Sequence, residues 1–123
     1  MRVRLTLPAD GGVLSAALEG LVAANAVILA RAGTVRRLYA SGVRYQRERG
    51  TEDWRTIPQV LRAGRGDCED LAAWRAAELR VYDAEPARAI VRRSGPKTLH
   101  AVVVRADGRI EDPARRLGMK GRG

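Results

Sequence analysis

The sequence predicts an α+β domain, and three observations support this fold class. Residues 13–32 form a long apolar run without proline, which favours a helix. Residues 71–82 consist of good helix formers and contain neither glycine nor proline, which predicts a second long helix. Residues 87–93 are rich in Ala, Ile and Val, and residues 99–105 and 109–112 flank an Asp-Gly turn, so these three segments are expected to form a small antiparallel sheet.

The length of 123 residues fits one domain. We expect that domain to cover residues 1–113, with a basic and loose tail over residues 114–123. Hydrophobic residues make up 46% of the chain, which is enough for a core, and the absence of Phe means that Leu, Val, Ile and Ala must fill it. One cysteine cannot form a disulfide within one copy, which favours a reduced, intracellular setting.

The formal net charge is +9, and arginines supply most of the positive charge. These arginines are spread along the chain, which is typical of a solvated surface. The same surface would attract an acidic substrate or nucleic acid. No basic motif interleaved with aromatic residues is present, so specific nucleic-acid recognition is not predicted.

The apolar run at residues 13–32 is interpreted as a core helix rather than a membrane span. It contains the polar residues Glu19, Asn25 and Arg31, which a membrane span disfavours. Residues 1–7 alternate between apolar and polar side chains, which predicts a short strand rather than a signal peptide. We therefore expect no membrane partner and a cytoplasmic location.

The middle of the chain is predicted to contain two shorter helices and a loop. Residues 34–40 are expected to form a helix that follows the long one. Residues 43–55 are polar and charged, which indicates an irregular loop. Thr56 is expected to cap a helix over residues 57–63, whose first turn tolerates a proline.

The only cysteine lies in the stretch Gly66-Asp67-Cys68-Glu69-Asp70. Asp67 suits the N-cap of the following helix, and Asp70 lies three residues later, which makes a variant of the capping box. Cys68 is then in the first helical turn, where free N–H groups and the helix dipole favour the thiolate. The sequence therefore predicts a thiol whose pKa lies below its ordinary value.

Two later residues are of the types that assist a cysteine nucleophile, a histidine and an aspartate. His100 is the only histidine and precedes the apolar residues 101–104, while Asp112 closes the next apolar segment and precedes Pro113. The order Cys68, His100, Asp112 suits a triad in which the imidazole takes the thiol proton. The carboxylate would then fix the tautomer of the ring.

The predicted hairpin determines whether the last two of these residues can touch. A two-residue turn would place Asp112 on the sheet face opposite to His100, because side chains alternate along a strand. A three-residue loop at residues 106–108 places Asp112 opposite Val102, on the His100 face and one diagonal step away. Gly108 suits the left-handed residue of that loop. We therefore predict this loop and a hydrogen bond between Asp112 and His100.

These motifs together resemble the transglutaminase-like superfamily of papain-like cysteine enzymes. The resemblance rests on the cysteine box at residues 66–70, on His100 at the head of a strand and on Asp112 after a hairpin. Residues 54–58 are also similar to the bacterial transglutaminase-like cysteine proteinases and their phage-encoded relatives. The similarity covers roughly residues 45–113. It implies a minimal papain-like core, with the cysteine-bearing helix packed on a small antiparallel sheet and helices N-terminal to it.

The resemblance implies cysteine-dependent acyl transfer on protein or peptide amides. Cys68 would be the nucleophile, His100 the acid and base, and Asp112 the orienting carboxylate. Hydrolysis would make the protein a protease or amidase, whereas an amine acceptor would make it a transglutaminase, and both stay open. The alternative is a catalytically inactive module on the same fold that serves in binding or assembly. A phage-associated protein would be virion-associated rather than free in the cytoplasm.

The oxyanion of such a reaction needs a side-chain donor besides the Cys68 backbone N–H. By analogy with transglutaminases, the indole N–H of Trp54 is the candidate. An equally open interpretation is that Trp54 is an aromatic residue covering the core. Gln46 and Gln59 are weaker candidates for the donor.

Three carboxylates surround the cysteine, at Asp67, Glu69 and Asp70. Calcium binding through these oxygens is implied by one branch of the similar bacterial proteinases. Helix capping and pairing with arginines is the interpretation that we favour, so no metal and no cofactor are expected. One Cys and one His fall short of a zinc site.

Overall fold

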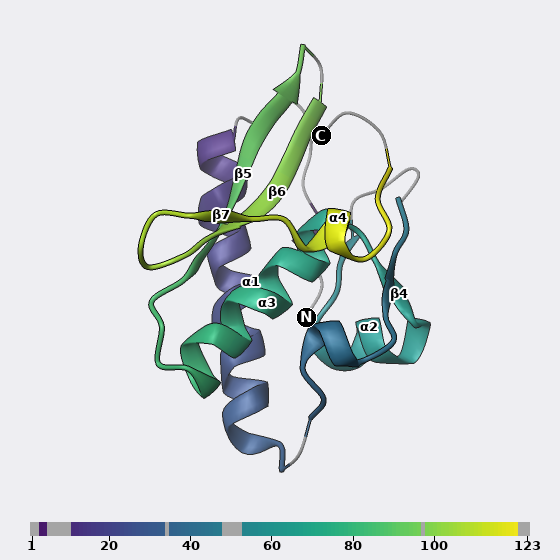
Figure 1. The fold of residues 1–123 in the computed structure, drawn as a ribbon, viewed down its shortest axis with the longest axis vertical. Helices are drawn as coiled ribbons and strands as arrows, with labels where there is room; N and C mark the ends of the chain where they lie inside the picture. The colour runs from purple at the N-terminus through teal and green to yellow at the C-terminus, as the bar shows by residue number, and fades with distance from the viewer. Residues whose placement is uncertain (1–2, 5–10, 34, 48–52, 97, 121–123) are drawn as a thin grey trace.

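The computed structural model describes residues 3–4, 11–33, 35–47, 53–96 and 98–120, and it confirms the α+β class (Figure 1). A long N-terminal helix and a helix that begins at the cysteine accompany a three-stranded antiparallel sheet. The described elements are, in chain order, β1 (Val3–Arg4), α1 (Gly11–Arg31), the 3₁₀ helix η1 (Leu38–Ala40), β2 (Arg44–Tyr45), β3 (Asp53–Trp54), α2 (Ile57–Ala63), β4 (Arg65–Gly66), α3 (Cys68–Tyr82), β5 (Arg88–Gly95), β6 (Thr98–Val104), β7 (Ile110–Glu111) and α4 (Pro113–Arg116).

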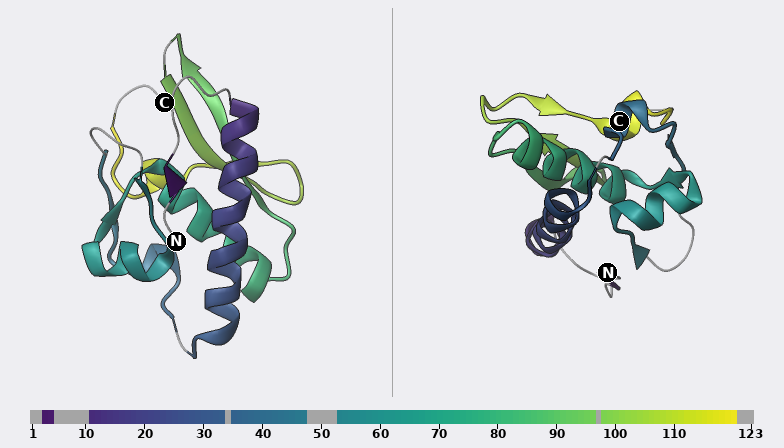
Figure 2. Two further views of the ribbon diagram at one scale, coloured as in Figure 1. Left: turned by 180° about the vertical axis from the view of Figure 1, so that it is seen from behind. Right: turned by 90° about the horizontal axis from the view of Figure 1, so that it is seen from below.

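The main sheet has the strand order β5–β6–β7, and α1 and α3 pack against it and against each other. In Figure 1, α1 runs behind β5 and behind α3, and Figure 2 shows α1 along the back of the molecule. One face of β5 and β6 joins the two helices in a single hydrophobic core. Its members include Leu18, Leu21, Leu71, Trp74, Ala89, Val91, Ala101 and Val103.

Two side chains of α1 tie this helix to its neighbours. The backbone N–H of Val91 donates to Ser15 Oγ at 2.8 Å, which links α1 to β5. The backbone N–H of Ile57 donates to Asn25 Oδ1 at 3.0 Å, which links α1 to the first turn of α2. Asn25 was noted in the sequence as unusual for a membrane span, and here it is a fully buried hydrogen-bonding residue of the interior.

The helix α1 is less deeply buried than its apolar sequence suggests. Val13 and Val27 are 55% and 53% exposed, so one side of the helix faces outward. By length and composition α1 is long and apolar enough to cross a membrane, and 33% of its most apolar window is buried. A core helix and an N-terminal signal sequence have the same composition, so α1 alone does not assign the chain to a compartment.

Two expectations for the middle of the chain are corrected. Within residues 35–40 only Leu38–Ala40 are helical, as one 3₁₀ turn. Arg37 is extended, with ψ at 153°, and the backbone N–H of Leu38 donates to the Glu78 carboxylate at 3.1 Å instead of entering a longer helix. The expected irregular loop contains two short strands, since β2 pairs with β4 in parallel and β3 pairs with β1. Residues 48–52 lie outside the described part.

The predicted hairpin is confirmed. Val103 pairs with Glu111 and Val104 with Ile110, which is the register of a three-residue loop. Gly108 has a φ of +89°, in the left-handed region that the loop requires.

The expectation of a loose tail from residue 114 onward is corrected for its first residues. Pro113–Arg116 form α4, and the side chains of Ala114 and Leu117 are 0% and 7% exposed. Both belong to the hydrophobic core, because this short helix packs against α3 and β6. Residues 121–123 lie outside the described part.

Candidate active site

The start of α3 has the predicted capping box. Asp67 Oδ1 accepts from the backbone N–H of Asp70 at 3.0 Å, and Asp70 Oδ2 accepts from the backbone N–H of Asp67 at 3.3 Å. The other oxygen of Asp70 accepts from the backbone N–H of Arg55 at 2.7 Å. A Cβ at Gly66 would lie 3.1 Å from Asp70 Cβ, so this tight arrangement depends on glycine before the cap. Burial, and then the Asp67 carboxylate, raise the pKa of Asp70 to about 9.

The Cys68 thiol is partly exposed and has two hydrogen-bonding neighbours. Its Sγ donates to Glu69 Oε2 at 3.1 Å, and the backbone N–H of Ala101 on β6 donates to Sγ. Burial raises the pKa of the thiol far above its ordinary value, and the Glu69 carboxylate raises it further, whereas the Ala101 N–H lowers it. The prediction of a lowered pKa is therefore wrong for this arrangement, because burial and an adjacent negative charge outweigh the helix start.

His100 and Asp112 are in contact, as the hairpin register predicted. His100 Nε2 lies 2.8 Å from Asp112 Oδ2, and the His100 side chain is 3% exposed. Asp112 is also the N-cap of α4, where Oδ1 accepts from the backbone N–H of Arg115 at 3.3 Å. The Arg115 guanidinium lies 3.5 Å from Oδ2. The carboxylate is thus held from both sides, toward the imidazole and toward the helix.

The thiol and the His–Asp pair involve neighbouring residues of strand β6. His100 contacts Asp112, and the next residue, Ala101, contacts the Cys68 sulfur. Among the described residues no hydrogen bond joins Cys68 to His100 itself, because the thiol donates to Glu69. Asp112 occupies Nε2, so Nδ1 is the ring nitrogen that does not contact this carboxylate.

The three oxyanion candidates differ in their surroundings. Trp54 is 0% exposed within the hydrophobic core, and its Nε1 has no hydrogen-bond partner among the described residues. This burial agrees with the interpretation of Trp54 as a core residue, and its contact with an oxyanion stays a prediction. Gln59 Oε1 accepts from the backbone N–H of Thr56 at 2.8 Å, so this side chain completes the cap of α2. Gln46 is exposed, and its backbone N–H donates to the carbonyl of Gly66 at 2.9 Å, close to the cysteine.

Two residues near the thiol were given no role in its chemistry from the sequence. Tyr45 pairs with Gly66 in the parallel strands β2 and β4. Burial raises the pKa of Tyr45, and so do Cys68 and Asp67, which places its hydroxyl in the electric field of the thiol site. Glu69 was considered only as a metal ligand or as a carboxylate that caps the helix and pairs with arginines. Because Glu69 directly follows Cys68 in the sequence, a contact between its carboxylate and the thiol could have been predicted.

The three carboxylates around the cysteine either cap α3 or accept a hydrogen bond from the thiol. Asp67 and Asp70 complete the capping box, and Glu69 accepts the thiol hydrogen bond. Within the described ranges, no group of three or more His, Cys, Asp and Glu side chains is arranged to hold a metal ion. Comparison of the chain with family models, with curated proteins and with solved structures finds no match.

Proposed function

We propose that this protein carries out cysteine-dependent acyl transfer on protein or peptide amides, with Cys68, His100 and Asp112 as the catalytic triad. One observation carries the proposal. The hydrogen-bonded His100–Asp112 pair lies on the strand whose next residue, Ala101, donates to the Cys68 sulfur. A cysteine at a helix start beside an imidazole oriented by a carboxylate is the arrangement that thiol acyl transfer requires.

In this proposal the Cys68 sulfur attacks the amide carbonyl while His100 Nδ1 takes the thiol proton. The tetrahedral oxyanion accepts from the backbone N–H of Cys68, which belongs to the first helical turn, where N–H groups lack partners within the helix. His100 then protonates the leaving amine as the carbon–nitrogen bond breaks. Water or a second amine attacks the resulting thioester, and the thiol is released.

The thiol must leave Glu69 before this reaction begins. In the structure the Cys68 sulfur lies 3.1 Å from Glu69 Oε2, and burial, which raises the pKa of the thiol, favours the protonated form that donates in this contact. A rotation of the Cys68 side chain transfers the same proton to a hydrogen bond with the imidazole. We infer that the structure represents the resting, protonated form of the site.

We further propose that the fold is a minimal transglutaminase-like core. Two features support this: α3 begins at the cysteine, and the sheet beside it presents His100 and Asp112 from β6 and from the end of β7. Nucleic acid and a virion or cytoplasmic setting are proposals that rest on the basic composition and the sequence resemblance alone.

The proposed activity is tested with a panel of peptide amides, each with and without a primary amine. We expect release of the leaving group and a thioester adduct on Cys68 by mass spectrometry of acid-quenched samples. Product that incorporates the amine identifies a transglutaminase, and free acid identifies a protease or amidase. Absence of both the product and the adduct across the panel contradicts the enzyme proposal.

Three variants assign the residues. Cys68→Ala is expected to abolish adduct and product while the free energy of unfolding changes little, because one small side chain replaces another. Asp112→Asn should lower kcat by orders of magnitude through loss of the oriented imidazole. Asp107→Asn is the matched control, because Asp107 is an exposed residue of the hairpin loop and should leave kcat unchanged.

A non-catalytic binding module is the second candidate, and the raised pKa of the thiol favours it. In that case Cys68 would be a buried small residue held by Glu69, and no peptide amide would form an adduct. The adduct measurement separates the two candidates, because it requires only the first chemical step.

A further inference from the structure

The carboxylate of Glu111, next to Asp112 in sequence, is held by three donors from three parts of the fold. Tyr39 Oη donates to Glu111 Oε2 at 2.5 Å, and Arg75 Nε donates to the same oxygen at 2.6 Å. The guanidinium NH1 of Arg105 donates to Oε1 at 2.7 Å. These donors belong to η1, to α3 and to the segment after β6, so Glu111 joins the hairpin to two other elements.

The strand that carries Glu111 makes few backbone and apolar contacts of its own. The strand β7 consists of Ile110–Glu111 and pairs with β6 over two residues only. Ile110 is 46% exposed and therefore contributes little apolar packing. Because charge-assisted hydrogen bonds are the stronger ones, the Glu111 side chain makes the strongest contacts of the two residues of β7.

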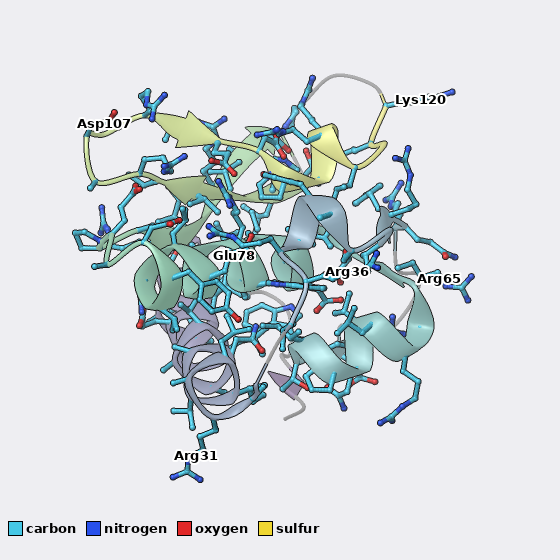
Figure 3. All side chains as sticks on the ribbon, turned by 60° about the horizontal axis from the view of Figure 1, so that its bottom comes forward. Arg31, Arg36, Arg65, Glu78, Asp107 and Lys120 are labelled. Atoms are coloured by element: carbon cyan, nitrogen blue, oxygen red, sulfur yellow. The ribbon has the colours of Figure 1, made fainter. Side chains whose placement is uncertain are left out.

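The donors to Glu111 are themselves fixed in place. Two guanidinium groups lie over the Tyr39 ring, with Arg75 Cζ 4.9 Å and Arg116 Cζ 4.0 Å from its centroid. Arg75 Nη1 also donates to Glu78 at 3.1 Å, and Glu78 is fully buried. Figure 3 shows Glu78 in the interior, whereas Arg31, Arg65 and Lys120 lie at the periphery. The carboxylate of Glu111 is therefore part of a rigid polar cluster.

We propose that Glu111 is the positioning residue of the site: its contacts with Tyr39, Arg75 and Arg105 fix β7 so that Asp112 meets the His100 imidazole. The proposal rests on the proposed function, in which that contact orients the catalytic imidazole. An orienting group has to be held within about half an ångström of its productive position, which a two-residue strand alone does not achieve. Glu111 faces away from His100, because it pairs with Val103, and so acts through Asp112.

The test follows the Nε2 proton of His100 by nuclear magnetic resonance. His100 is the only histidine of the chain, so the imidazole signals need no assignment between residues. The wild-type protein is expected to show a protected Nε2–H proton that is hydrogen-bonded to a carboxylate. In Glu111→Gln we expect this proton to exchange with water at least about tenfold faster, and kcat to fall by about tenfold to a hundredfold as the imidazole loses its orientation.

Glu19→Gln is the matched control. It removes the same charge from an ion pair with another arginine of α3, Arg80, and neither Glu19 nor Arg80 belongs to the cluster around Glu111. Its imidazole exchange rate should equal that of the wild type. Equal acceleration in both variants would show general loosening and overturn the proposal, as would an unchanged rate in folded Glu111→Gln.

Tyr39→Phe serves if Glu111→Gln does not fold, because it removes one donor without changing a charge. A smaller but measurable acceleration of the imidazole exchange supports the proposal, and an unchanged rate contradicts it. The exchange rates do not depend on turnover. A wild-type protein without amidase or transamidase activity, but with the expected exchange pattern, would therefore overturn the proposed function and leave the positioning role intact.

Discussion

At the scale of single residues, the chemistry of the site depends on the balance around one thiol. The Ala101 N–H stabilises negative charge on the Cys68 sulfur, whereas burial and the Glu69 carboxylate oppose it. Burial is the largest of these effects, and it raises the pKa of the thiol and so favours the protonated form. Glu69 is the contributor that a single substitution removes without altering the packing.

The first prediction concerns this carboxylate. Glu69→Gln removes a negative charge next to the sulfur, so the pKa of Cys68 should fall and the thiolate fraction should rise. We expect alkylation by iodoacetamide at pH 8 to be at least about tenfold faster, which corresponds to about one unit of pKa. The measurement is the rate of alkylation by iodoacetamide across a pH series. Glu19→Gln is the control, because Glu19 pairs with Arg80 on the surface; equal rates in the wild type and Glu69→Gln would contradict the argument.

At the scale of elements, the hairpin and the cap of α3 place the two halves of the site. The loop around Gly108 sets the register that brings Asp112 to the His100 face. The capping box at Asp67 and Asp70 sets the start of α3 and with it the position of Cys68. The loop and the capping box each depend on residues that are close in sequence, and each is tested by its own substitution.

The hairpin prediction uses a pair of glycines that differ in conformation alone. Gly108 and Gly33 both have open space where a Cβ would be, but only Gly108 has a positive φ, at +89°. Gly108→Ala should lower the free energy of unfolding by about 1–2 kcal/mol, because a left-handed residue with a side chain is strained. Gly33→Ala should leave it nearly unchanged. Urea unfolding of both variants is the measurement, and equal costs would contradict the conformational explanation.

The cap prediction concerns the pH dependence of stability. The pKa of Asp70 in the folded state, about 9, lies above the ordinary value of about 3.9 expected in the unfolded chain. The folded state therefore holds this proton more tightly, and the resulting stabilisation is complete below about pH 4. It declines as the pH rises toward 9 and is lost above it.

Asp70→Asn removes this titration while keeping one carbonyl oxygen, which can still accept from one of the two backbone N–H groups, those of Arg55 and Asp67, that the carboxylate binds. The free energy of unfolding of the wild type, relative to that of the variant, should fall steadily between pH 5 and pH 9 in urea titrations. Asp107→Asn, on the exposed loop, should show no such trend over the same range. A difference that is constant with pH would contradict a raised Asp70 pKa.

At the scale of the whole molecule, the C-terminal helix completes the core. The residues Ala114 and Leu117 join the cluster that α1, α3 and the sheet form, and Asp112 caps the same helix. The strand that precedes Asp112 is therefore followed directly by a packed helix. The packing of α4 in the core therefore holds Asp112 in place together with the hairpin.

A pair of leucines tests this role of the C-terminal segment. Leu117→Ala should lower the free energy of unfolding by about 2–4 kcal/mol, because it leaves a cavity in the core. Leu61→Ala makes the same chemical change at a position that is 41% exposed and should cost about 0.5 kcal/mol or less. Thermal or urea unfolding measures both. Equal costs would mean that residue 117 does not belong to the core.

The sequence by itself determined the features that depend on neighbouring residues. The helices α1, α2 and α3, the caps at Thr56 and Asp67 and the loop at Gly108 follow from periodicity, side-chain capping and backbone sterics. The contact between His100 and Asp112 could be predicted for the same reason. Once the loop length is known, the alternation of side chains decides which residues share a face.

Only the tertiary structure decided the features that depend on distant segments. The raised pKa of Cys68, the burial of Trp54 and the ordering of residues 114–117 each depend on which side chains pack around them. The three donors to Glu111 likewise come from far along the chain. Desolvation and long-range ion pairing are set by the surrounding packing, and local sequence patterns contain no information about it.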